Sequence, residues 1–301
     1  MATIAAPNSQ QSVRAAPRRG GTPGGLLLLL PAPLGWMIFF YLVPLVFLLV
    51  HAFWSVDYLT IVRTFTLDNF RTLFTNDLYL RVLTRTVTIA ALVTIADLIL
   101  AFPLAYFLAK RVTKHRELLL LLVVFPLWSS YLIRVFAWKT ILGTNGILNS
   151  FLLGVGVIDQ PATAFLYSKT AMFLTFSHVW LPFMILPLFT VLDRMPSSLI
   201  EAASDLGSNW WQTFLRVVLP LSLPGILAGS LSVFSLTLGD YITPTLLGGP
   251  GDQMIGRLVA DNFGMSNNWP LGATLIIPIL LIVSLFIAVA NRYGALGRTE
   301  A

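Results

Sequence analysis

Acidic and aromatic side chains inside apolar segments are the residues of this chain whose types could do chemistry. Asp97 and Asp240 each lie within a long apolar run. A charge in hydrocarbon is unfavourable, so each carboxylate is expected to line a polar path or to be paired internally. An acid among aromatic rings attracts a cationic, methylene-rich solute through charge and cation–π contacts. The candidate lining residues of such a path are Asp97, Trp128, Tyr131, Arg134, Trp138, Asp240 and Tyr241.

Structural roles stay open for the same residue types. Asp97 is also suited to accept hydrogen bonds from Thr or Ser hydroxyls, or to pair with a cation such as Arg134. Trp and Tyr near the ends of membrane spans commonly form an interfacial belt. Ser177 and His178 could suggest an intramembrane serine protease, but adjacent side chains on a helix diverge. His178 is therefore expected to be a structural hydrogen-bonding residue.

Composition places these residues in a membrane protein. The chain has 301 residues, of which 56% are hydrophobic and 11% charged, and its mean hydropathy is +0.82. A soluble domain carries about 25% charged residues. Cysteine is absent from the sequence, which excludes disulfides and thiolate metal sites. The net charge of +6 comes from cations at the ends of apolar runs, which indicates membrane topology rather than nucleic-acid binding.

Six apolar runs are long enough for membrane-spanning helices, since a helix needs about 20 residues to cross the hydrocarbon. The predicted fold is an all-α integral membrane protein with a disordered cytoplasmic tail at 1–25, a transmembrane domain at 26–293 and a second cytoplasmic tail at 294–301. The predicted spans are about 26–50, 86–109, 118–140, 171–192, 221–244 and 271–290.

Positive charge predicts the orientation of these spans. An even number of spans places both termini on one side. Taking that side as the cytoplasm puts eleven of the nineteen Lys and Arg residues inside, including the compact cluster Lys110–Arg116. Cations in short loops favour the cytoplasmic side, so both termini are expected there.

A loop between the fourth and fifth spans, at 196–220, has the pattern of helix, glycine, helix. Pro196 suits a first helical turn, and Leu199, Ala202, Ala203 and Leu206 recur on one helical face. Glu201, Ser204 and Asp205 occupy the other face. Gly207 suits a left-handed C-cap, and Ser208 can cap the second helix. Such a short helix is suited to dock into a partner's groove, and an interfacial helix on lipid head groups is the alternative.

This loop resembles the EAA loop of ABC importer permeases. The sequence reads Glu201-Ala202-Ala203, three residues, Gly207, nine residues, Val217, one residue, Leu219-Pro220, and Val217 in place of Ile is its one departure from the family pattern. The resemblance implies a coupling helix that fits a cleft on a cytoplasmic ATPase subunit. The residues that it implies for ATPase coupling are Glu201, Ala202, Ala203, Asp205, Leu206, Gly207, Leu219 and Pro220.

Further motifs are similar to those of the spermidine/putrescine branch of these permeases. They include Phe125–Trp128, Leu132–Trp138, Gly143–Asn149 and Gly239–Tyr241. The resemblance covers roughly residues 26–293 and implies a polyamine as the solute. It also implies a bacterial inner-membrane location, a second permease subunit expected to be a different chain, an ATPase dimer and an external substrate-binding protein.

The chain itself is expected to bind no cofactor and to be no enzyme. The sequence holds no Gly-x4-Gly-Lys-Ser/Thr phosphate loop, so ATP and magnesium would belong to the partner ATPase. Membrane lipid is an expected partner and nucleic acid is not. A self-sufficient secondary carrier or channel remains the alternative, although such carriers usually show an internal repeat.

Overall fold

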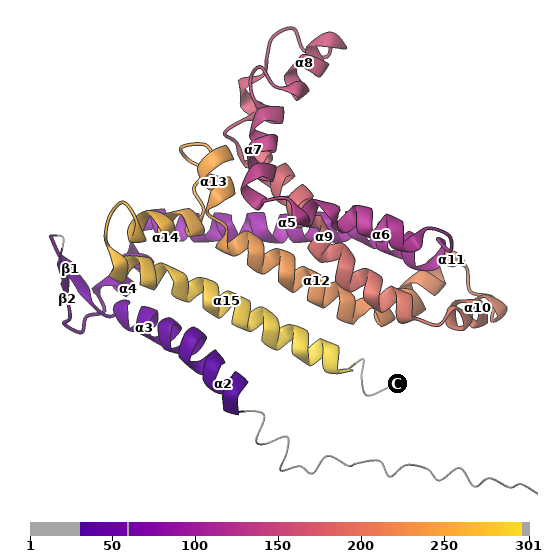
Figure 1. Ribbon diagram of the computed structural model, residues 1–301, viewed down its shortest axis with the longest axis horizontal. Helices are drawn as coiled ribbons and strands as arrows, with labels where there is room; N and C mark the ends of the chain where they lie inside the picture. Colours follow the sequence, from indigo (N-terminus) through magenta and orange to yellow (C-terminus); the bar gives the residue numbers. More distant parts are fainter. Residues whose placement is uncertain (1–30, 59, 297–301) are drawn as a thin grey trace, which may run out of the picture. The chain divides into compact units, whose positions relative to one another are not determined.

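The computed structural model describes residues 31–58 and 60–296 (Figure 1). The predicted tail at 1–25 and the last five residues of the chain lie outside this part. The first residues of the predicted 294–301 tail continue a helix that ends at Leu296. The chain divides into two compact units, the first ending at Leu48 and the second beginning at Leu49.

The first unit contains one apolar helical segment. It consists of α2 (Pro31–Met37), η1 (Ile38–Leu42) and the start of α3 (Val43–His51). The turn η1 is π-helical, with Val43 N–H donating to the Ile38 carbonyl. Pro44 is the second residue after this turn. A proline ring clashes with the carbonyl four residues earlier in an α-helix, and a wider turn relieves that clash.

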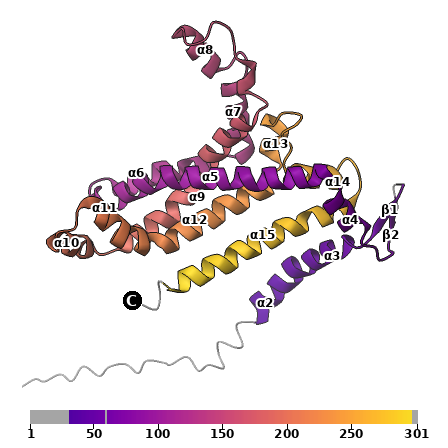
Figure 2. The ribbon, with the colours of Figure 1, turned by 180° about the vertical axis from the view of Figure 1, so that it is seen from behind.

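Three long helices form the core of the second unit. They are α5 (Asp77–Lys110), α9 (Lys169–Arg194) and α12 (Leu219–Gly239), which pack against one another (Figure 2). Their contact buries apolar side chains completely, including Val93, Phe176 and Met184. α15 (Trp269–Leu296) packs on α12. Within the described residues, five helical segments are long and apolar enough to cross a membrane, or up to six if one bent pair counts as a span.

Shorter elements connect these helices. β1 (Ser55–Asp57) and β2 (Thr60–Val62) form an antiparallel hairpin, the one departure from an all-helical fold among the described residues. The short helical elements of the connections are α4 (Asp68–Thr75), α8 (Ile147–Gly154), η3 (Thr163–Phe165), α10 (Ser197–Asp205), α13 (Ile242–Leu247) and α14 (Ile255–Phe263).

The predicted third span, 118–140, is not one continuous helix. It consists of α6 (Arg116–Val124), η2 (Phe125–Trp128) and α7 (Tyr131–Leu142), and the chain bends by 89° at the break. Pro126 has no N–H to continue the α-helical ladder. The Ser129 hydroxyl then donates to the Pro126 carbonyl at 2.7 Å, and Ser129 and Ser130 adopt extended backbone angles.

Two other helices differ from the predicted spans at their ends. α5 begins at Asp77, nine residues before the predicted start at 86, because the Asn76 side chain caps it by accepting from Leu78 N–H at 2.9 Å. The predicted 221–244 span begins earlier, through α11 (Trp210–Thr213) and the π-helical η4 (Phe214–Val218), and ends at Gly239. The π-turn again stands directly before an X-Pro pair, here Leu219-Pro220.

Candidate functional site

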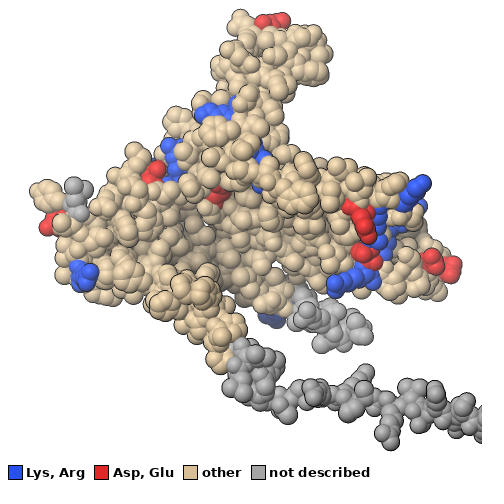
Figure 3. All heavy atoms as spheres, viewed as in Figure 1, with Lys and Arg blue, Asp and Glu red and all other residues tan. Residues whose placement is uncertain are grey.

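The predicted coupling loop lies at the end of the second unit where α5 and α9 both reach their carboxyl termini. The Lys110 ammonium donates to the Met195 carbonyl, and the Arg116 guanidinium forms an ion pair with Asp193. The basic cluster Lys110–Arg116 and the loop are therefore at the same end of this unit. Figure 3 shows basic and acidic side chains gathered over this end, beside α10 and α11.

α10 presents most of its surface to solvent. Glu201, Ala202 and Asp205 are exposed, and Leu206, which follows the helix, has 88% of its surface accessible. The predicted apolar and acidic faces of this helix do not differ clearly in burial. Ile200 and Ala203 are the half-buried residues of this helix, whereas Ala202 and Leu206 point outward. The exposed surface of α10 thus combines carboxylates with small and apolar side chains.

The turn after α10 depends on a glycine. Gly207 has φ +82°, so the predicted left-handed glycine is confirmed. Its N–H donates to the Ser204 carbonyl at 2.9 Å, and Ser208 N–H donates to the Ala203 carbonyl at 3.0 Å. These bonds satisfy carbonyls that the helix end leaves free. The predicted N-cap Ser208 is wrong by one residue: Asn209 accepts from Gln212 N–H at 2.9 Å, and the Gln212 side chain accepts from Asn209 N–H at 3.0 Å.

Asp240 lies between two helices rather than inside one. Its backbone is extended after Gly239, and its Oδ1 accepts from Ile242 N–H at 2.7 Å, which caps α13. Its other oxygen accepts from the Thr243 hydroxyl at 2.9 Å and from the Tyr131 hydroxyl. Asp240 as a whole is 7% exposed. Asp240 therefore lies at the end of α12, and its hydrogen bond with Tyr131 links that end to the first residue of α7.

The other candidate lining residues, apart from Asp97, divide into three groups. Near Asp240, Tyr131 stacks on Trp180 with ring centroids 5.0 Å apart, and the Arg134 guanidinium lies 5.9 Å from the Tyr131 ring centre. Trp128 and Tyr241 are exposed. Trp138 Nε1–H donates to His178 Nδ1 at 3.1 Å, which confirms the structural hydrogen bond expected of His178. Trp180 and Thr243 were not predicted, since both reach the site from separate helices without a local sequence signal.

Asp97 is completely buried in α5. It does not pair with Arg134, whose Nη1 donates to the Val179 carbonyl at 3.2 Å instead. Among the described residues, the Ser177 hydroxyl is the side-chain group that interacts with the Asp97 carboxylate, although the two form no hydrogen bond of ordinary geometry. The structure thus brings Tyr131, Arg134 and Asp240 together and leaves Asp97 apart from them.

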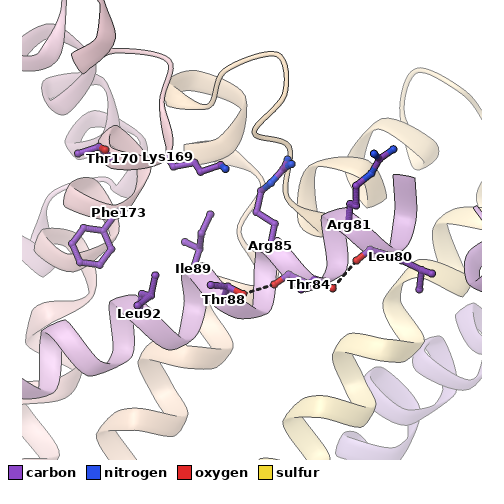
Figure 4. Close-up of a pocket in the computed structure, with 10 residues that line it drawn as sticks. All are labelled: Leu80, Arg81, Thr84, Arg85, Thr88, Ile89, Leu92, Lys169, Thr170 and Phe173. Carbon is purple, nitrogen blue, oxygen red and sulfur yellow. Dashed lines mark hydrogen bonds between the residues drawn. The ribbon is translucent and has the colours of Figure 1, made fainter. Parts of the chain in front are cut away.

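A basic cavity of about 640 Å³ lies at the opposite end from the coupling loop (Figure 4). Arg81 and Arg85 approach it from α5 and Lys169 from the first turn of α9, above the apolar side chains of Leu92 and Phe173. Arg85 donates to the backbone carbonyls of Gly251 and Gln253, the latter at 3.2 Å, and Lys169 lies 3.9 Å from Asp252. Three cations against one carboxylate do not suit a cationic solute. None of the residues that line this cavity belongs to the Asp240 site, so the two are separate.

Comparison with known proteins gives consistent matches over almost the whole chain. Residues 25–296 match the model of the binding-protein-dependent transport system inner membrane component family. The chain is 41% identical over 288 residues to the inner membrane ABC transporter permease protein YdcU of Escherichia coli K12, covering 91% of each chain. It is 37% identical over 263 residues to the spermidine/putrescine transport system permease protein PotB of the same strain, covering 87% of this chain and 95% of PotB.

Solved structures show the same fold at lower sequence identity. A chain of a bacterial ABC transporter for import of the acidic polysaccharide alginate matches with a TM-score of 0.69 at 19% identity, over 91% of this chain and 94% of the other. A chain of the MetNI methionine ABC transporter matches with a TM-score of 0.54 at 15% identity, over 74% of this chain and 95% of the other. These likenesses concern the arrangement of helices.

Proposed function

The chain belongs to the family of binding-protein-dependent transport system inner membrane components, and on this premise we propose that it forms, with a second and different permease subunit, the path of a polyamine into the cell. As a member of this family it is a multi-pass permease of the inner membrane, and a separate ATPase subunit hydrolyses ATP. The proposal adds the solute, the ATPase-coupling role of α10 and the cytoplasmic location of both termini.

The exposed surface of α10 carries the coupling part of this proposal. Glu201 and Asp205 have no hydrogen-bond or ion-pair partner elsewhere in the described residues, so the fold of the chain leaves them available to another protein. The turn at Gly207 connects this helix to α11, which continues through η4 into α12. ATP-driven closure of an ATPase dimer that grips α10 would thus be transmitted to the packed α5, α9 and α12.

Similarity to PotB and the chemistry of Asp240 support a polyamine as the solute. The PotB name assigns that protein to spermidine/putrescine transport, and the alignment covers 95% of it. In this chain, Asp240 supplies a carboxylate, Tyr131 and Trp180 supply aromatic rings, and exposed Tyr241 lies next to the carboxylate in the chain. A cationic solute with a methylene chain is attracted by such a set. In this proposal the Tyr131–Asp240 hydrogen bond opens when the solute passes.

The charge of Asp240 is expected to be required for polyamine uptake. Asn keeps the side-chain oxygen that caps α13 but removes the charge, so Asp240→Asn is expected to insert and fold normally. Loss of one ion pair of about 1.4 kcal/mol corresponds to a loss of about tenfold in affinity. We expect spermidine uptake to fall by about tenfold in proteoliposomes that contain the complete transporter, its binding protein and ATP.

Tyr131→Phe serves as the matched control, since it removes a hydrogen bond to Asp240 and keeps the ring and the charge. Uptake in this variant is expected to exceed that of Asp240→Asn. Unchanged spermidine uptake in Asp240→Asn would exclude Asp240 from the path.

The purified chain alone is expected to transport nothing. A permease subunit provides half of a path and no ATPase, whereas a secondary carrier or channel would work without partners. Measuring spermidine flux into liposomes that contain only this chain, with an imposed ion gradient, separates the two functions. Flux comparable to that of the complete complex would contradict the permease proposal.

A further inference from the structure

A second cavity, of about 560 Å³, lies between the coupling loop and the long helices. Its walls are almost entirely apolar and aromatic. Ile200 comes from α10, Trp210 and Trp211 from α11, and Ile226 from α12. The remaining lining residues are Leu98, Ile99, Phe102, Pro103, Tyr106, Thr213, Phe214, Val218 and Leu219. None of the transport roles proposed above uses this cavity.

One polar group in this wall is without a partner. Thr213 is 6% exposed, and its hydroxyl makes no hydrogen bond within the described part of the chain. A buried hydroxyl without a partner is unfavourable, and most buried polar groups in proteins are satisfied. Tyr106, Trp210 and Trp211 also carry hydrogen-bond donors, but Thr213 is the wall residue whose donor is both buried and without a partner among the described residues. This pattern matches a ligand that is a hydrocarbon chain with acceptor atoms at one end.

The surroundings of the cavity indicate a membrane lipid. Trp210 and Trp211 are both exposed at its rim, as is typical of aromatic residues at the boundary between acyl chains and head groups. Arg216 follows Thr213 by three residues and is exposed. Lys110, Arg111, Lys114, Arg116 and Arg194 belong to the same end of the unit, as do the acids Glu117, Asp193, Glu201 and Asp205, so cations outnumber acids there. This positive charge complements a lipid phosphate, and basic pockets between membrane helices are known to bind anionic head groups.

We infer that this cavity binds one acyl chain of an anionic phospholipid, with the ester carbonyl accepting a hydrogen bond from the Thr213 hydroxyl and the phosphate near Arg216. The acyl chain contacts Ile200 of α10 and Phe102 of α5 at the same time. It thereby stabilises the position of the coupling helix against a membrane-spanning helix. Assignment of this lipid to the cytoplasmic leaflet rests on the orientation in the proposed function.

Fluorescence of the cavity's own tryptophans provides the test. The complete transporter is placed in detergent and titrated with lysophosphatidylglycerol whose acyl chain is brominated, since bromine quenches nearby tryptophan. The contribution of the pair is obtained by subtracting the Trp210→Phe/Trp211→Phe variant. We expect saturable quenching, and a dissociation constant about fivefold weaker in Thr213→Val because one hydrogen bond is lost.

Filling the cavity separates a specific site from general contact with lipid. Ile226→Phe adds volume inside the cavity and is expected to abolish the saturable component of quenching. Ile95→Phe adds the same volume on an exposed part of α5 outside the cavity and is expected to leave it unchanged. Equal quenching in Ile226→Phe and the original protein would overturn the inference. No saturable quenching of either protein would also overturn it, since another protein segment would then cover the cavity.

A functional measurement on the same proteins tests the stabilising role. In delipidated transporter, adding phosphatidylglycerol is expected to increase substrate-stimulated ATP hydrolysis at least twofold for the original chain and for Ile95→Phe, but not for Thr213→Val at the same lipid concentration. Failure of the quenching assay would contradict the lipid site, whereas failure of polyamine uptake alone would contradict the proposed function.

Discussion

Reversing the charge of Glu201 is expected to abolish ATP-coupled uptake without unfolding the chain. Glu201 is exposed on α10 and forms no ion pair among the described residues. Exposed substitutions of this kind change the free energy of unfolding by about 0.5 kcal/mol or less. A cleft that binds the carboxylate of Glu201 repels a lysine at the same position, and such a pair of like charges costs several kcal/mol. Glu201→Lys should therefore prevent the ATPase subunit from docking. Co-purification of the ATPase and uptake in proteoliposomes are expected to fall by more than about tenfold.

The matched control is Glu117→Lys. Glu117 is exposed at the same end of the second unit, in the first turn of α6 and outside the loop. Glu117→Lys reverses the same charge in the same region as Glu201→Lys, so a general electrostatic effect would lower uptake in both variants. Normal ATPase binding and uptake in Glu201→Lys would contradict the coupling role of α10.

A second variant of this loop changes its geometry instead of its charge. Gly207 is in the left-handed region at φ +82°, and a Cβ added there would meet no atom within 4 Å. Any effect of substitution must therefore come from the backbone or from a partner. The left-handed conformation costs an L-residue about 1–2 kcal/mol, least for Asn and most for β-branched residues. We expect Gly207→Val to lower coupled uptake strongly and Gly207→Asn to retain most of it.

The sequence predicts the helices of this fold better than it predicts their interruptions. Apolar runs locate α5, α9, α12 and α15 because hydrocarbon requires every backbone group in a span to be paired within a helix. The breaks at Ser129 and Asp240 depend on side chains that hydrogen-bond to the backbone. A count of apolar residues does not record such bonds. The early start of α5 differs from the prediction for a related reason, since Arg81 and Arg85 lower the hydropathy of its first turns.

The residues of the candidate sites also differ in how well the sequence predicts them. Gly207 was predictable because a left-handed C-cap is a local property of the chain. By contrast, Trp180 stacks on Tyr131 from a separate helix, and Thr213 lines a cavity formed by five elements. Such neighbours are determined by packing over long sequence distances. For Asp97 the sequence leaves a Ser or Thr hydroxyl and Arg134 as alternative partners, and only the packed structure shows that Ser177 is the neighbour and Arg134 is not.

The contact between α9 and α12 gives the second large expected effect. Gly225 and Gly229 lie on the face of α12 that meets α9. A Cβ at Gly225 would lie 2.9 Å from the Pro187 carbonyl oxygen and 3.2 Å from the Leu188 Cα, both backbone atoms. A Cβ at Gly229 would lie 3.2 Å from the Met184 Cα. Small residues at this spacing allow membrane helices to approach closely. The two helices can therefore accept a larger side chain here only by moving apart.

Gly225→Leu is accordingly expected to reduce the yield of folded protein severely, although leucine is the better helix former by about 0.8 kcal/mol. Overpacking costs about 1–3 kcal/mol when side chains can adjust, and more when backbone atoms must move. The control is Gly239→Leu, at the last residue of α12, where a Cβ would meet no atom within 4 Å. Thermal melting of the purified chains in detergent measures the difference. We expect Gly239→Leu to melt like the original protein and Gly225→Leu to melt far below it, and equal melting temperatures would show that the helices do not approach this closely.

Because α12 follows the coupling loop directly, the contact at Gly225 would carry movement of α10 into α9. Any Gly225 variant that still folds, such as Gly225→Ala, is therefore expected to lose uptake before it loses ATPase binding.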